Sequence, residues 1–130
     1  MIHERDRQLT AVVEEAMAVE DIESAAIFVV SGAGSLQLVA AAGIDGAPLD
    51  ALKEAVLDPG HPVTRALADD GPSFDVYPMN PGGPRLRSHL PFRNDNGEPA
   101  GVLAVAHDIA LQDPQRQLLI LLAERASRHV

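Results

Sequence analysis

The sequence predicts an α+β domain in which a mostly antiparallel sheet carries a helix from each end of the chain. Amphipathic helical patterns occupy residues 3–21 and 113–130. Between them, strand-like runs come in pairs joined by short turns, which favours antiparallel hairpins over parallel crossovers. A chain of 130 residues buries a sizeable core as one unit. We therefore expect residues 1–130 to form a single domain.

The first helix is predicted by apolar side chains at the i, i+3, i+4 spacing of one helix face. These side chains are Leu9, Val12, Val13, Ala16 and Met17. The run AAIFVV (25–30) then has the β-branched residues of a strand, SGAGS (31–35) reads as a turn, and LQLVAAAG (36–43) alternates. This pattern predicts a hairpin with one strand buried on both faces.

The middle of the chain predicts two short helices followed by an edge strand. Pro48 can open a helix at its first turn, and DPGHP (58–62) breaks it. A second short helix follows at 63–67. SFDVYP (73–78) resembles a short edge strand, and the Pro- and Gly-rich segment 79–84 is expected to be a surface loop.

A second hairpin is predicted for RSHLPFRNDNGEPAGVLAVAHD (87–108). Alternation places Arg87 and His89 on one face of the first strand. If the NDNG turn holds an even number of residues, His89 lies opposite Val102 or Ala104, and Arg87 opposite Ala104 or Ala106. The basic side chains would then lie beside small alanines, which leaves room for a ligand or for a closely packed helix and loop.

The opposite face of this hairpin is bulky enough to pack on the terminal helices, through Leu90, Phe92, Leu103 and Val105. The closing helix is expected to start with Asp113 as N-cap and Pro114 at the first helical position. Its apolar run 118–122 covers every side of the helix, more than one sheet contact can bury. Either the first helix or a second protomer should cover the surplus.

Composition excludes several classes of partner. The formal net charge is −9, and Lys53 is the only lysine, so nucleic acid and anionic membranes are poor partners. Absence of cysteine excludes disulfides, Cys-ligated metals and thiol nucleophiles. The charged start is no secretory signal, and the longest apolar run, 118–123, is too short to cross a bilayer. We expect a cytoplasmic protein that does not bind membranes.

Each candidate site residue also has an ordinary structural explanation. Arg87, His89 and Arg93 could bind an anion, or they could face solvent and pair with nearby aspartates. His61 and His107 lack the spacing of a metal motif, so no metal site is predicted. Adjacent strand residues face opposite ways, which argues against a catalytic Ser88–His89 pair. No catalytic residue is assigned, and the protein is not expected to be an enzyme.

The order of motifs resembles the GAF domain family, the sensory fold related to PAS domains. The segments LRSHLPF, DNGEPAGVLAVAH and DPQRQLLILLAERAS resemble the family's paired central strands and closing helix. AAIFVVSGAGSLQLVAAAG resembles its first hairpin, and GHPVTRALADDGP its G–x–x–x–x–A–x–x–x–G–x–P helix. The resemblance covers about residues 5–128.

This resemblance implies an antiparallel sheet of five or six strands, with the N- and C-terminal helices on one face and short helices and loops over a pocket on the other. It implies a sensory or regulatory domain that binds a small ligand, with anions among the candidates, signals through its terminal helices and forms homodimers. A ligand-free dimerisation or protein-interaction module is one alternative, and an enzyme of unrecognised type is a second, disfavoured one. The candidate ligand-binding residues are Arg87, His89, Ala104, Ala106, Phe74 and Tyr77.

Departures from the family's motifs argue against some classes of ligand but do not identify the ligand. Cyclic-nucleotide-binding members often carry an Asn–Lys pair, which this sequence lacks. Bilin attachment and the free methionine sulfoxide reductases of this fold depend on cysteine, which is also absent. No cofactor is predicted.

Overall fold

The structure, a computed structural model, describes residues 4–77 and 86–130. Four helices and five strands follow one another along these residues: α1 (Glu4–Met17), β1 (Ile22–Val30), β2 (Leu36–Ala42), α2 (Gly46–Ala55), α3 (Pro62–Ala66), β3 (Ser73–Val76), β4 (Leu86–Arg93), β5 (Pro99–His107) and α4 (Asp113–Ser127). The loop predicted for 79–84 lies outside the described residues. None of the helices in the described part of the chain is long and apolar enough to span a bilayer.

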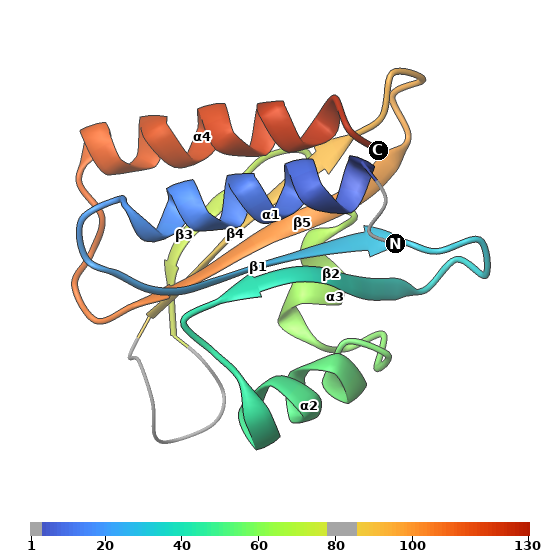
Figure 1. The fold of residues 1–130 in the computed structure, drawn as a ribbon, viewed down its shortest axis with the longest axis horizontal. Coiled ribbons are helices and arrows are strands. Elements are labelled where there is room, and N and C mark those ends of the chain that lie inside the picture. Colours follow the sequence, from blue (N-terminus) through green and yellow to red (C-terminus); the bar gives the residue numbers. More distant parts are fainter. Residues whose placement is uncertain (1–3, 78–85) are drawn as a thin grey trace.

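The strands form one five-stranded sheet in the order β2-β1-β5-β4-β3, with every neighbouring pair antiparallel. Helices α1 and α4 run antiparallel beside each other over one face, and α2 and α3 lie on the other side (Figure 1). The predicted α+β class, the antiparallel sheet and the shared face of the terminal helices are therefore confirmed.

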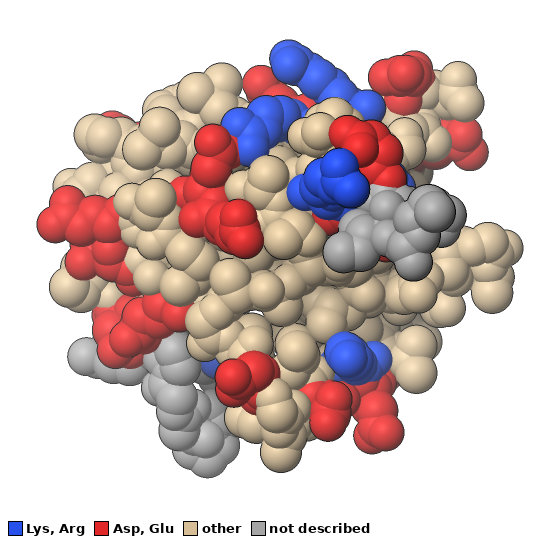
Figure 2. Space-filling model, in the orientation of Figure 1, with Lys and Arg blue, Asp and Glu red and all other residues tan. Residues whose placement is uncertain are grey.

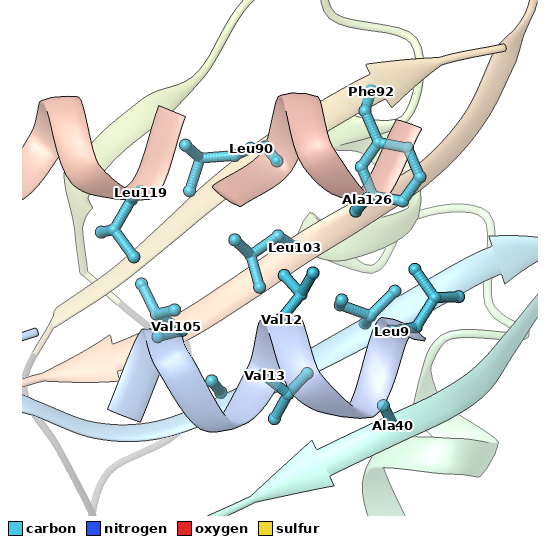
Figure 3. Packing of buried hydrophobic residues seen from close by; sticks show 14 of the residues in the cluster. Leu9, Val12, Val13, Ala40, Leu90, Phe92, Leu103, Val105, Leu119 and Ala126 are labelled. Atoms are coloured by element: carbon cyan, nitrogen blue, oxygen red, sulfur yellow. The ribbon is translucent and has the colours of Figure 1, made fainter. Parts of the chain in front are cut away.

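The larger part of the core lies between the sheet and the terminal helices. Leu103 and Val105 of β5 point toward α1 and α4, where Leu9 and Leu119 are fully buried (Figure 3). Leu90 and Phe92 of β4 belong to the same cluster. The bulky face predicted for the second hairpin thus packs where the sequence placed it, because burial of these side chains stabilises only this orientation of the strands.

A smaller cluster covers the other face. Phe28 and Val102 meet Val56, Val63 and Ala66 from the α2–α3 segment. Strand β1 contributes to both clusters, as predicted for a strand buried on both faces. None of the residues of helix α2 is buried. Its C-cap, Val56, is buried and packs into this cluster.

The N-terminus of α4 differs from the prediction. Gln112, not Asp113, is the N-cap, and Pro114 lies one position further into the helix. The Gln112 backbone N–H donates to Gln115 Oε1 at 2.7 Å. A glutamine at the third helical position can satisfy the N-cap amide in this way, which lets the helix begin one residue earlier than the Asp–Pro pair suggests.

Gly101 is the position where the sheet tolerates no side chain. A Cβ there would overlap the Phe28 carbonyl oxygen and lie 2.5 Å from Phe92 Cζ. We expect Gly101→Ala to lower the free energy of unfolding by about 1–3 kcal/mol through overpacking, as measured by urea denaturation. Gly32→Ala is the control, since no heavy atom lies within 4 Å of its added Cβ. Equal stabilities of the two variants would contradict this packing.

Candidate ligand-binding face

The pairing of β4 with β5 brings four of the predicted site residues together. Arg87 lies opposite Ala106, and His89 lies opposite Ala104. This is one of the two registers that the hairpin allowed. We call Arg87, His89, Ala104 and Ala106 the basic face. Their side chains point away from the terminal helices, since the alternate residues of both strands pack on those helices.

His89 is buried but its imidazole has no hydrogen-bond partner among the described residues. The residue is 5% exposed. Burial lowers its pKa to about 4, assisted by His61 and Arg87 and opposed by Asp69. No fully buried side-chain nitrogen or oxygen in the described residues lacks a partner, so the His89 ring nitrogens must retain contact with solvent. At neutral pH the ring is uncharged and offers one donor and one acceptor.

Arg87 places a cation beside this neutral ring. Its side chain is half-buried, and one guanidinium nitrogen donates to the Leu86 carbonyl oxygen at 3.2 Å. Burial lowers the pKa of Arg87, and the carboxylates of Asp108 and Glu23 act in the opposite direction. An arginine remains charged under such conditions, so the basic face keeps a positive group next to an uncharged donor.

His61 is a neighbour of this face that the sequence did not predict. It is the N-cap of α3, and its Nδ1 accepts a hydrogen bond from the Val63 N–H at 3.2 Å. Because Nδ1 accepts, the proton of the neutral ring resides on Nε2, which remains a donor. Burial lowers the pKa of His61, against the effect of Asp58. The His–Pro step at a helix start was the available signal, but it does not reveal the distance to His89.

The alanine floor is only partly covered. Ala104 lies in the central strand β5 but is not fully buried, although Leu52 and Leu67 belong to the cluster it packs against. Two hollows that described residues line are found elsewhere. One of about 290 Å³ lies between α4, β4 and residues 67–72, and one of about 320 Å³ lies between β2 and α2. Neither is lined by a residue of the basic face.

The remaining candidates, Phe74, Tyr77 and Arg93, are not among the four residues that this pairing brings together. Phe74 packs toward the terminal helices, with the Arg116 guanidinium 4.9 Å from its ring centre, so the structure does not bring it to the basic face. Tyr77 is 73% exposed at the end of β3. Arg93 donates to Asp70 at 3.3 Å and to the Gly97 carbonyl at 2.8 Å. An exposed pair of this kind is typical of a solvated strand end.

Ser88 and His107 form a buried pair on the opposite face, with 2.8 Å between Oγ and Nε2. His107 Nδ1 lies 2.9 Å from the Ile109 carbonyl oxygen, which can only accept. The ring proton is therefore on Nδ1, Nε2 accepts, and the Ser88 hydroxyl donates. Neither residue has exposed surface, so the pair orders the core and offers a substrate no access.

The described residues contain no group of three or more histidines or carboxylates that could hold a metal ion. Acidic side chains stand at several separate places on the face shown in Figure 2, as expected for a chain of net charge −9. Arg87, the half-buried cation of the basic face, has the carboxylates of Asp108 and Glu23 near it. A ligand attracted to it must be small enough to avoid the surrounding carboxylates.

No protein-family model and no curated protein sequence matches the chain. Solved structures do. The second GAF domain of DevS from Mycobacterium smegmatis has a TM-score of 0.76 at 20% identity, over 95% of this chain and 91% of that one. A fragment of a methyl-accepting chemotaxis protein has a TM-score of 0.72 at 25% identity, over 95% and 87%.

A third similar structure is an enzyme. The type II free methionine-R-sulfoxide reductase from Thermoplasma acidophilum has a TM-score of 0.72 at 17% identity, over 94% of this chain and 92% of that one. GAF domains recur among the other similar structures, including one from a sensor histidine kinase of Pseudomonas syringae. The chain therefore has the fold of a GAF domain, as its motifs predicted.

His89 should make the stability of the domain depend on pH. Its pKa is about 4 in the folded chain and about 6.5 when unfolded. The unfolded chain therefore binds the extra proton between these values, and the free energy of unfolding falls as pH drops from about 6.5 to 4. The loss should approach roughly 3 kcal/mol.

Chemical denaturation of wild type and His89→Gln across pH 4–7.5 measures the contribution of His89 to the pH dependence of the free energy of unfolding. The difference at pH 7.5, where His89 is neutral in both states, gives the packing cost of the substitution. We expect the variant to lose less stability than wild type on acidification. Parallel pH profiles for the two proteins would show that His89 is not the buried neutral group described above.

Proposed function

We propose that this domain is a non-enzymatic sensory or regulatory module that binds a small anionic ligand on the basic face. The structural change caused by binding would be transmitted to the terminal helices on the other side of the sheet. The observation that carries the proposal is His89: it is 5% exposed and without a hydrogen bond among the described residues, beside the guanidinium of Arg87. We place this function in the cytoplasm, since nothing in a cysteine-free chain depends on an oxidising compartment.

The ring nitrogens of His89 have no hydrogen-bond partner among the described residues and keep contact with solvent. They can therefore bind a ligand without first breaking a hydrogen bond inside the protein. A carboxylate or phosphate oxygen could accept from the neutral His89 ring and from the fork of Arg87. The ligand would replace solvent at these groups, and the adjacent alanine floor would contact its apolar part.

The similar structures support the sensory part of the proposal. They include a domain of a sensor histidine kinase and a fragment of a chemotaxis protein. The chain has no cysteine, so thiol-based reduction of methionine sulfoxide is not part of the proposal. The Ser88–His107 pair is fully buried and gives no other enzymatic reaction a starting point.

Thermal-shift assays with acetate, succinate, inorganic phosphate and adenosine 5′-monophosphate test ligand binding. At one hundred times its Kd a ligand stabilises the fold by about 2.7 kcal/mol, which raises Tm by several degrees. We expect at least one probe to do so, and Arg87→Ala to abolish the shift. Arg128→Ala, at the exposed C-terminal end of α4, should retain it. A shift that survives Arg87→Ala would refute the site.

A second candidate function is a ligand-free dimerisation or protein-interaction module. It is favoured by the packing of Ala104, Leu52 and Leu67 against one hydrophobic cluster, and by the position of the two hollows away from the basic face. Under this function none of the four probes would change Tm, and the α2–α3 segment would simply close the sheet.

Both candidate functions include a homodimer formed through the terminal helices. Leu118 and Leu121 of α4 are 51% and 60% exposed, next to the partly buried Leu122. Burying a leucine contributes roughly 2 kcal/mol, so a second protomer seated on this side of α4 would gain from all three. The outward side of α1 carries charged residues instead, which leaves α4 as the apolar contact.

Sedimentation velocity measures this assembly. We expect wild type to be a dimer and Leu121→Glu to be a monomer, because the substitution places a charge in the contact. Leu57→Glu is the matched control, since Leu57 is also 60% exposed but lies beyond α2. A monomeric wild type, or a dimer unaffected by Leu121→Glu, would contradict the proposed interface.

A further inference from the structure

Strand β3 is attached to the sheet at few positions. Among the described residues it pairs with β4 where Ser73 lies opposite His89 and Val76 lies opposite Arg87, with a bulge between these two pairs. Within the bulge, Asp75 has a φ of 58°. An aspartate tolerates this left-handed conformation better than most side chains, and bulges re-aim the side chains they carry.

The bulge directs the Asp75 carboxylate to the start of helix α4. Oδ1 accepts from the Leu111 backbone N–H at 3.0 Å, and Oδ2 accepts from the Arg116 guanidinium at 2.6 Å. Arg116 Nε also donates to the Leu111 carbonyl oxygen at 3.1 Å, and its guanidinium stacks over Phe74. One edge-strand carboxylate thereby holds both the residue before the N-cap of α4 and the first turn of the helix.

The backbone of Asp75 is held from the other side. Its N–H donates to Ser88 Oγ at 3.1 Å, and Ser88 in turn donates to His107, whose ring donates to the Ile109 carbonyl. These bonds run from β3 through β4 and β5 into the segment that leads to α4. The side-chain and backbone contacts of Asp75 therefore connect the same edge strand to the same helix entry by two routes.

The residues of β4 that pair with β3 belong to the basic face. Val76 and Ser73 face Arg87 and His89 across the ladder, so a displacement of β4 at these residues shifts β3. We propose that Asp75 couples the basic face to helix α4, passing such a displacement through its carboxylate to Leu111 and Arg116. This coupling rests on the proposed function for its biological meaning, but it is a property of the chain without ligand. Asp75 acts here as a positioning residue.

Amide hydrogen exchange by NMR tests the coupling without a ligand. In wild type, we expect Arg87→Ala to change the exchange rates of the Leu111 and Arg116 amides by about tenfold. In the Asp75→Asn background the same substitution should change them less than twofold. Asparagine keeps the left-handed preference and loses the ion pair with Arg116. Arg116→Gln breaks the same ion pair on the arginine side, and it replaces Asp75→Asn as the background if that variant does not fold.

Arg93→Ala is the control, because it removes an exposed contact to Asp70 from the same strand and should leave both amides unchanged. Equal effects of Arg87→Ala in the wild-type and Asp75→Asn backgrounds would overturn the coupling, as would no effect in wild type. A failed ligand screen combined with the expected exchange pattern would refute the proposed ligand and leave the coupling in place.

Discussion

The register between β4 and β5 is the constraint on which the rest of the structure depends. Side chains alternate along a strand, so a slip of one residue would exchange the two faces of the hairpin. Leu90 and Phe92 on one strand, with Leu103 on the next, fill the space under the terminal helices. Their burial stabilises a single register, and Arg87 and His89 are placed on the other face as a consequence. Apolar packing on one side thus positions the polar groups on the other.

This division gives the two faces different roles. The side under α1 and α4 is a continuous apolar core, and its polar groups, such as Ser88 and His107, are satisfied by each other. The other side is thinly covered by short helices and holds a cation beside an unpaired neutral imidazole. The ring nitrogens keep contact with solvent, and the ligand proposed above would use them as hydrogen-bond donor and acceptor. The GAF fold determines how the sheet and helices are arranged, and Arg87 and His89 give the basic face its polar groups.

Local patterns in the sequence predicted most of the fold and part of the candidate site. Alternation and the NDNG turn limited the position of His89 to two partners, one of which the structure has. The bulge in β3 could not be predicted, because alternation assumes a regular strand. Phe74, a candidate ligand-binding residue, packs against the cluster under the terminal helices. The proximity of His61 to His89 depends on how α3 docks, which no local pattern encodes. The N-cap at Gln112 depends on a side-chain contact from Gln115.

The central claim is that one sheet separates the basic face from an apolar helix face. The most direct measurement is a set of nuclear Overhauser contacts from the His89 ring and the Leu90 methyl groups in uniformly labelled protein. The account predicts contacts from His89 to Ala104 and the α3 segment, and from Leu90 to α4. Contacts from His89 to α1 or α4, with Leu90 facing α3, would show that the register is shifted and would contradict the account.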